Sequence, residues 1–326
     1  MYRAIKRFKM SKASRDDLQP VSRIQNSKHH AEPSKEFQPD PSPSQITRRQ
    51  FGLGMLGLAA GTRFYRPDKL APSVIGGVKI GAQSYTFRAF ISIDKLIQAL
   101  QGVGLSYVEL WDGHLNPMKT SEAEFKSVKT RFDDAGITVG AYCVNFPVDA
   151  SDEYLDRGFN GALLLGTSVM TASVQKAIVP RLDQWCQKYK IKLGLHNHWF
   201  GDKWFHGDKS KEFESPDDLL TALKGSSDYL SINLDVGHFY AAGYDPVSFF
   251  RQNHKRIVSL HLKDRDKDPD RTHRRFGQGA TPISEVMKLA HQVRFPYVAN
   301  IEYEEEMANP SDAVRAAVAY LRQVLS

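Results

Sequence analysis

The sequence has few cysteines and no hydrophobic run long enough to cross a membrane comfortably. Cys143 and Cys186 are the two cysteines among 326 residues, and neither a CxxC pair nor a zinc-knuckle spacing occurs. We expect two buried free thiols, because free cysteine is among the most buried residue types. A disulfide stays an alternative if the protein is exported. The apolar run that follows residue 50 is too short for a comfortable transmembrane helix.

The main part of the chain also lacks an excess of charge. The formal net charge is +7, but residues 1–65 contain 12 lysines and arginines against five acidic residues, which accounts for all of it. Residues 66–326 contain 32 of each. A nucleic-acid-binding domain normally carries a basic face, so we expect no nucleic-acid partner for this part.

The first 65 residues read as a leader. Residues 1–46 are rich in Ser, Pro, Gln and charged residues, a composition typical of disorder. Arg48-Arg49 then precedes a weakly apolar, glycine-rich run, which is typical of a twin-arginine export signal. We therefore expect an exported, periplasmic-type location and the twin-arginine export machinery as a partner. The alternative is a chance Arg-Arg before a short helix, because the segment before it is long and no Ala-x-Ala site follows.

From residue 78 onward, short apolar stretches alternate with segments of helical periodicity. The predicted strands are 79–84, 107–110, 138–144, 162–165, 192–196, 231–235, 257–262 and 298–303, and predicted helices include 92–102, 121–135, 172–190, 216–223 and 246–254. Eight alternations in roughly 250 residues fit a parallel (β/α)₈ TIM barrel over 66–326. No glycine-rich phosphate-binding turn follows the first strand, which argues against a doubly wound nucleotide-binding sheet.

Four metal-ligand residues lie at the ends of the last four predicted strands. They are His196, Asp235, His261 and Glu302. The carboxyl ends of barrel strands meet on one face, so these side chains are expected to surround one divalent ion. A mixed nitrogen and oxygen set suits Mn²⁺, our first choice, or Zn²⁺, Co²⁺ or Fe²⁺, rather than Ca²⁺, which prefers oxygen ligands alone.

Three further side chains are candidates to act beside the ion. His238 follows the aspartate ligand by three residues and could bind substrate or carry a proton, or simply pack at a helix start. Lys263 shares the inward side of its strand with the histidine ligand, so it could bind a substrate oxygen or form an ion pair with Glu302 or Glu304. Glu109 ends the second predicted strand and is either a catalytic carboxylate or a charge-paired barrel residue.

Aromatic residues near these positions are candidates to bind a sugar. Trp111 and Trp199 each follow a predicted strand, and sugars present apolar C–H faces that stack on such rings. Two long polar loops, 199–214 and 265–278, are expected over the same face and are candidates for substrate contact. Ordinary packing under the loops is the alternative for these aromatic residues.

The motifs Leu-Asp-Val-Gly-His (234–238), His-Leu-Lys-Asp (261–264) and Ile-Glu-Tyr-Glu (301–304) resemble the xylose isomerase-like TIM-barrel superfamily, and more closely its sugar phosphate isomerase/epimerase group. The resemblance covers about residues 78–325. It implies one divalent metal, Mn²⁺, Mg²⁺, Co²⁺ or Zn²⁺, on the residues His196, Asp235, His261 and Glu302. It also implies a carbohydrate substrate and a homo-oligomer, since such barrels are often dimers or tetramers.

One departure from the family matters for the chemistry. The first ligand in the epimerases is normally Glu, which forms a two-base pair with the last Glu, whereas His196 stands here within Leu-His-Asn-His. A metal-bound imidazole has no lone pair left to accept a proton. The His-Asn-His version resembles exported members that handle 3-keto sugars and cleave glycosidic bonds by elimination. The base would then be His198, His238 or Glu109.

The predicted function is therefore a metal-dependent enzyme of the sugar isomerase/epimerase type. A polarised sugar carbonyl would lose a proton from the adjacent carbon. The alternative is a 3-keto-glycoside lyase or hydrolase, which shares this first step. A non-catalytic sugar-binding barrel is a second alternative. A metal-dependent phosphodiesterase is disfavoured, because 66–326 has no net charge and no obvious basic stripe, and too few further His and Glu fall at strand ends.

Overall fold

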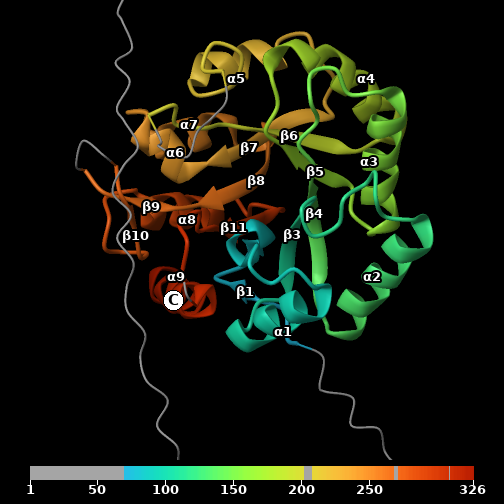
Figure 1. Cartoon of the computed structure of the whole chain (residues 1–326). Helices are drawn as coiled ribbons and strands as arrows, with labels where there is room; N and C mark the ends of the chain where they lie inside the picture. Colours follow the sequence, from blue (N-terminus) through green and yellow to red (C-terminus); the bar gives the residue numbers. More distant parts are fainter. Residues whose placement is uncertain (1–69, 202–207, 268–270, 308) are drawn as a thin grey trace, which may run out of the picture. The chain divides into compact units, whose positions relative to one another are not determined.

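The computed structural model describes residues 70–201, 208–267, 271–307 and 309–326 (Figure 1). Eight parallel strands form its core: β2 (Val78–Gln83), β3 (Tyr107–Trp111), β4 (Thr138–Cys143), β5 (Val169–Ala172), β6 (Lys192–His196), β7 (Leu230–Asp235), β8 (Ile257–Leu262) and β11 (Val298–Ile301). Their order is β2-β11-β8-β7-β6-β5-β4-β3, and β2 also pairs with β3, so the ring closes. The predicted TIM barrel is confirmed. The predicted leader lies outside the described residues.

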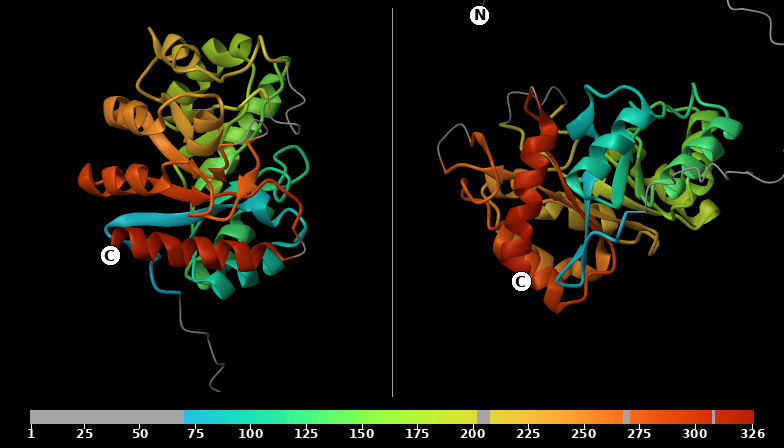
Figure 2. Two further views of the ribbon diagram at one scale, coloured as in Figure 1. Left: turned by 90° about the vertical axis from the view of Figure 1, so that its left-hand side faces the viewer. Right: turned by 90° about the horizontal axis from the view of Figure 1, so that it is seen from below.

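Helices follow the strands and lie around the barrel (Figure 2). They are α1 (Ile93–Val103), α2 (Glu122–Asp134), α3 (Asp152–Leu164), α4 (Val179–Tyr189), α5 (Pro216–Leu223), α6 (Val236–Ala241), α7 (Pro246–Asn253), α8 (Ile283–Gln292) and α9 (Pro310–Leu325). Three 3₁₀ turns are η1 (Ser84–Phe87), η2 (Lys176–Ile178) and η3 (His254–Arg256). The short strand β1 (Val74–Ile75) pairs antiparallel with β2, and β9 (Asp264–Arg265) forms a hairpin with β10 (His273–Arg274).

Local sequence explains where several helices begin and end. The Ser92 hydroxyl accepts a hydrogen bond from Lys95 N at the start of α1, and Gly104 ends the helix with φ of 75°. Only glycine adopts that left-handed conformation readily. Asp245 and Asn309 cap α7 and α9, each directly before a proline at the first helical position. These capped helices place their apolar faces on the barrel.

The predicted strand at 162–165 is wrong. These residues lie at the end of α3 and directly after it, and the fourth strand is β5. A four-residue apolar run does not distinguish a strand from a buried helix end. In the helix, Leu163 is 46% exposed while Ala162 is fully buried, a pattern that follows helical packing.

The predicted helix at 172–190 is too long. Residue 172 ends β5, a loop and η2 follow, and α4 begins at Val179. Pro180 occupies the first turn of α4, where its missing N–H leaves no hydrogen bond unmade. The apolar spacing upstream of it belongs to Val174 in the loop and Ile178 at the end of η2, which pack into the core.

The cysteine prediction is confirmed, since Cys143 and Cys186 are both buried and both free. Burial raises the pKa of the Cys143 thiol well above its ordinary value. Among the described residues, no helix is both long and apolar enough to cross a membrane.

Candidate metal centre and active site

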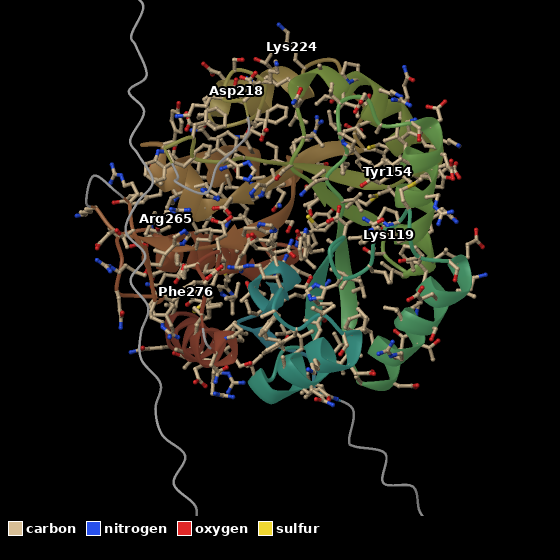
Figure 3. All side chains as sticks on the ribbon, in the orientation of Figure 1. Lys119, Tyr154, Asp218, Lys224, Arg265 and Phe276 are labelled. Atoms are coloured by element: carbon tan, nitrogen blue, oxygen red, sulfur yellow. The ribbon has the colours of Figure 1, made fainter. Side chains whose placement is uncertain are left out.

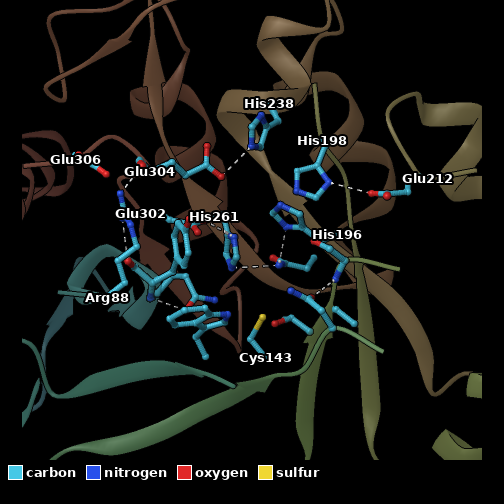
Figure 4. Close-up of a pocket in the computed structure, with 18 residues that line it drawn as sticks. Arg88, Cys143, His196, His198, Glu212, His238, His261, Glu302, Glu304 and Glu306 are labelled. Atoms are coloured by element: carbon cyan, nitrogen blue, oxygen red, sulfur yellow. Dashed lines mark hydrogen bonds and ion pairs between the residues drawn. The ribbon is translucent and has the colours of Figure 1, made fainter. Parts of the chain in front are cut away.

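A cavity of about 520 Å³ opens at the carboxyl ends of the barrel strands (Figure 4). The described residues that line it are Gln83, Tyr85, Arg88, Trp111, Cys143, Asn145, Thr171, Ala172, Ser173, His196, His198, Glu212, Asn233, His238, His261, Glu302, Glu304 and Glu306. This is the face of a TIM barrel on which active sites are built. The cavity is large enough for a small carbohydrate.

The structure brings the four predicted metal ligands together. His261 Nδ1 lies 2.6 Å from Glu302 Oε2 and 3.9 Å from Asp235 Oδ2, and His196 Nε2 lies 4.0 Å from Asp235 Oδ2. His196, Asp235 and His261 each offer one ligand atom, and these atoms all lie within 4.8 Å of one another. Asp235 pairs with His261 in the β7–β8 register, which sets two of these side chains side by side.

The donor set of these side chains fits a divalent ion. Asp235 Oδ2, His261 Nδ1 and Glu302 Oε2 are buried and lack a well-formed hydrogen bond, although the Lys263 ammonium lies beside the two oxygens. Asp235 Oδ1, in contrast, accepts from His238 N at 2.7 Å. Two imidazoles with two carboxylates form a donor set suited to Mn²⁺, Zn²⁺ or Co²⁺.

Glu109 lies beneath this cluster and holds the His261 ring. Its two oxygens accept hydrogen bonds from Gln83 Nε2 (2.7 Å), Thr171 Oγ1 (2.6 Å), Ser259 Oγ (2.9 Å), His261 Nε2 (2.8 Å) and Asn300 Nδ2 (3.1 Å). This bond turns His261 Nδ1 toward Asp235 and Glu302, as outer carboxylates do for metal-bound histidines. Because Glu109 is fully buried and both its oxygens are engaged, we assign it a positioning role, in place of the proton acceptor that the sequence left open.

Electrostatics agree with this arrangement. Burial alone would lower the pKa of His261, but the Glu109 and Glu302 carboxylates outweigh it and raise that pKa well above its ordinary value. For His196, burial lowers the pKa well below its ordinary value, and the neighbouring His198 and His261 add to the effect. Without an ion, the two carboxylates therefore favour the charged form of His261, whereas the surroundings of His196 favour its neutral form.

Lys263 forms the ion pair that the sequence offered as one alternative. Its Nζ lies 2.7 Å from Asp235 Oδ2, 3.1 Å from Glu302 Oε2 and 2.7 Å from Glu304 Oε1. Burial would lower the pKa of Lys263, but the three carboxylates outweigh it and raise that pKa above the ordinary range. The charged ammonium therefore sits against two of the predicted metal ligands.

His238 is engaged on both ring nitrogens. Its Nε2 lies 3.2 Å from Glu304 Oε1, and its Nδ1 lies 3.2 Å from Arg265 Nη2. Burial and the nearby Lys263 charge lower the pKa of His238 well below its ordinary value. A neutral ring that accepts from Arg265 and donates to Glu304 is thereby held in one orientation.

His198 and Glu212 form a pair at the wall of the cavity. His198 Nδ1 lies 3.7 Å from Glu212 Oε2, and their side chains are 21% and 16% exposed. His198 N also donates to Phe213 O at 2.8 Å, which fixes the loop that carries Glu212. His196, His198 and His238 form a second group with ligand atoms within 4.8 Å. The hydrogen bonds of His238 make that group the weaker candidate for an ion.

The two predicted sugar-binding tryptophans occupy different surroundings. Trp111 lines the cavity and meets the Tyr85 ring edge-on at 5.0 Å. The Arg88 guanidinium lies over the Tyr85 ring, 4.5 Å from its centroid, and donates to Glu304 O at 2.7 Å. Trp199 lies against the Arg265 guanidinium at 5.6 Å and is not among the described residues that line the cavity.

Strand β9 lies beside the site, because its Arg265 contacts His238 at 3.2 Å and Glu304 at 3.3 Å. Arg265 on β9 is fully buried, and Arg265 and Phe276 lie on the same side of the barrel (Figure 3). Phe276 packs between Tyr303 and Tyr320, with ring centroids at 5.7 and 6.1 Å. Asp264 accepts from Gly277 N and Gly279 N at 2.8 and 3.0 Å, which anchors the chain after the hairpin.

Several site residues were not singled out from the sequence. Glu304 lies two residues past Glu302, so the alternation used for Lys263 would also have indicated it. Asn233 Nδ2 lies 3.1 Å from both His196 Nδ1 and His261 Nε2 and precedes the aspartate ligand by two residues. Glu212 lies in a polar loop, where no periodicity marks it.

His114, on the loop behind Trp111, supplies a test of pH-dependent stability. Its Nδ1 lies 3.1 Å from Ser84 Oγ and its Nε2 3.2 Å from Phe90 O. Burial lowers its pKa below 6.5, so the unfolded chain takes up this proton first. The resulting loss of stability is absent above pH 6.5, grows as the pH falls below it, and levels off below the folded-state pKa.

We therefore expect His114→Gln to flatten the fall of the urea unfolding midpoint between pH 6.5 and 5. The buried His196 and His238 also lower the unfolding midpoint as the pH falls. Both proteins contain them, so the difference between variant and wild type isolates the contribution of His114. Parallel midpoint curves for the two proteins would contradict the expectation.

The fold and the cavity define this chain as a TIM barrel with a potential metal centre at the carboxyl ends of its strands. Residues 172–324, from the end of β5 into α9, match the family model described as xylose isomerase-like TIM barrel. No curated protein matches the sequence.

Solved structures show the same fold at low identity. A sugar phosphate isomerase/epimerase from Parabacteroides distasonis is 20% identical, with TM-score 0.56, covering 76% of this chain and 96% of its own. A probable 3-DHS dehydratase AsbF from Bacillus anthracis is 18% identical, with TM-score 0.60, covering 75% and 98%. The IolI protein with a bound zinc atom is 16% identical, with TM-score 0.59, covering 76% and 98%. At these identities the likeness shows the fold alone.

Proposed function

We propose that this protein is a metal-dependent carbohydrate enzyme that removes a proton from the carbon beside a sugar carbonyl. The observation that carries the proposal is the meeting of His196, Asp235 and His261 beside a large cavity, with Glu302 2.6 Å from His261 and three ligand atoms without a well-formed hydrogen bond. A divalent ion held there would polarise the substrate carbonyl as a Lewis acid. We favour Mn²⁺ and keep Zn²⁺, Co²⁺ and Mg²⁺ as alternatives. Zinc is the metal that the IolI structure binds.

His198 is the side chain that we propose as the proton acceptor. Glu109 is saturated with donors, and His238 is held by Arg265 and Glu304. His198 lines the cavity, and Glu212 faces its Nδ1. A carboxylate beside an imidazole can orient the ring for proton transfer. The ring takes the proton, and the C–H electron pair moves toward the carbonyl.

Two outcomes of this step are open to the site. In an isomerase or epimerase, the proton returns to a neighbouring carbon or to the opposite face. In a keto-glycoside lyase, the bond to the β-oxygen breaks instead. His196 stands where the epimerases have the first carboxylate of their two-base pair, so Glu302 is the member of that pair that is still a carboxylate in the cavity. This favours the lyase outcome. The printed names of the neighbours, an isomerase/epimerase and a dehydratase, fit either outcome.

The predicted twin-arginine signal favours an unphosphorylated substrate, because an exported enzyme would meet free sugars. Export and a homo-oligomeric state are predictions of the same kind.

The test is to load the protein with Mn²⁺ and incubate it with a 3-keto-glucoside or with free ketohexoses in D₂O, followed by NMR. Deuterium entry with a new epimer or isomer would support the isomerase/epimerase outcome. Release of the aglycone would support the lyase outcome. A protein that binds Mn²⁺ and sugar without deuterium exchange or cleavage would contradict the enzyme proposal and favour a sugar-binding barrel.

Glu109→Gln tests the hydrogen bond beneath the centre. We expect Mn²⁺ affinity to fall by about 10- to 100-fold, as for other outer carboxylates of metal-bound histidines. Glutamine keeps the volume, so the fold should be retained, with a lower thermal midpoint. Competition with a fluorescent chelator measures the affinity, and Glu285→Gln on the outer helix α8 is the control. Unchanged affinity in a folded variant would remove the positioning role.

A further inference from the structure

We infer that Lys263 is a built-in competitor for the metal site, and that Glu304 holds its ammonium beside the site when the ion enters. This inference rests on the proposed metal-dependent function. Lys263 and Glu304, which lie outside the proposed ligand set, would then set how tightly the ion binds.

Lys263 contacts the same oxygen atoms that an ion would bind. Lys263 Nζ contacts Asp235 Oδ2 at 2.7 Å and Glu302 Oε2 at 3.1 Å. These are the same oxygens that face His261 and that make no well-formed hydrogen bond. An ion bound to them would use the lone pairs that now face the ammonium, so the two cations exclude each other from these atoms.

The Lys263 ammonium cannot leave the neighbourhood of the site easily. The Lys263 side chain is fully buried and has no contact with bulk water. A Cβ at Gly237 would lie 2.5 Å from Lys263 Cβ, which shows how closely helix α6 packs on this stem. The ammonium therefore stays near the site and must keep a partner there, because an unpaired buried charge is very unfavourable.

Glu304 is the partner that remains for the ammonium. Glu304 Oε1 lies 2.7 Å from Lys263 Nζ and belongs to none of the predicted ligand positions. Glu304 is itself held by His238 at 3.2 Å and Arg265 at 3.3 Å. It thus keeps its place whether Lys263 contacts three carboxylates or one. Metal binding then changes the partners of Lys263 from Asp235, Glu302 and Glu304 to Glu304 alone.

The measurement is the Kd for Mn²⁺ of the full chain, by competition with a fluorescent chelator, together with the thermal midpoint without metal. Lys263→Met should bind Mn²⁺ at least about ten-fold more tightly, because a positive charge beside the ion is removed. Its metal-free thermal midpoint should fall, because three buried carboxylates lose their counter-charge. These opposite changes distinguish competition from a purely structural role, which would weaken both. Lys176→Met, which breaks a partly exposed pair with Asp218 at 2.6 Å, is the matched control for net charge.

Glu304→Gln tests the partner. It should weaken Mn²⁺ binding by about five-fold or more, since Lys263 then depends on Asp235 and Glu302 alone and an acidic neighbour is lost. In the Lys263→Met background the same change should cost less, and that double-mutant comparison isolates the part that acts through the lysine. If Lys263→Met does not fold, Glu304→Gln decides alone, and an unchanged Kd overturns the inference.

The outcomes separate this inference from the proposed function. Mn²⁺ binding by wild type with no gain in folded Lys263→Met overturns the competition and leaves the metal-dependent function standing. Binding by Lys263→Met but not by wild type supports the competition and overturns the metal-dependent function. Absence of binding in both overturns both.

Discussion

Glu302→Gln is expected to abolish turnover and to lower Mn²⁺ affinity by at least about 100-fold, beyond the usual effect of an outer-shell change. Glu302 lies at the end of β11 with Oε2 2.6 Å from His261 Nδ1 and 3.1 Å from Lys263 Nζ. Burial would raise the pKa of Glu302, but Lys263 and His261 outweigh it and hold that pKa below its ordinary value. The carboxylate is therefore charged and available to an ion, whereas the amide of glutamine is a poor ligand.

The control for this variant is Glu306→Gln, which removes a carboxylate from the same cavity wall without touching the four ligands. It should keep Mn²⁺ affinity within about two-fold of wild type. Chelator competition measures the affinity, and NMR in D₂O measures turnover. Sugar binding that survives in Glu302→Gln while turnover is lost would exclude the non-catalytic barrel. Turnover that survives at full rate would remove Glu302 from the proposed centre.

The meeting of the four candidate ligands could be predicted because the ends of parallel barrel strands lie together on one face. The predicted strands 192–196 and 257–262 match β6 and β8 at both ends. Each is an apolar run with a ligand histidine at or beside its carboxyl end, and parallel strands bring those ends together. The signal was weakest at 162–165, where a short leucine run fits a helix end as well as a strand.

The residues around the ligands depend on long-range contacts that no local pattern records. The position of Glu212 depends on the contact between His198 N and Phe213 O, which folds the long loop back on its own strand. The saturation of Glu109 depends on donors from four other strands. The sequence could offer Glu109 as an inward carboxylate, but only the packed barrel shows that its oxygens are engaged.

His198→Gln is expected to lower kcat by about 100- to 10,000-fold, the usual contribution of a positioned proton acceptor. Mn²⁺ affinity should stay within about two-fold, because His198 is outside the proposed ligand set, and KM should change little. Deuterium exchange at the substrate carbon should be lost together with turnover, since proton removal is the shared first step. Glu212→Gln should cause a smaller loss, because it removes the orienting carboxylate 3.7 Å from Nδ1 but keeps the imidazole.

His114→Gln is the matched control, since it replaces a histidine behind the cavity wall that is not among the described lining residues. It should leave kcat within about two-fold of wild type. Full deuterium exchange in His198→Gln, with exchange lost in a Glu302→Gln protein saturated with Mn²⁺, would assign proton removal to Glu302. The chemistry would then return to a carboxylate base. Loss of exchange in His198→Gln with normal metal binding would assign that step to the imidazole, and would explain how a barrel with His196 in place of a carboxylate can still abstract a proton.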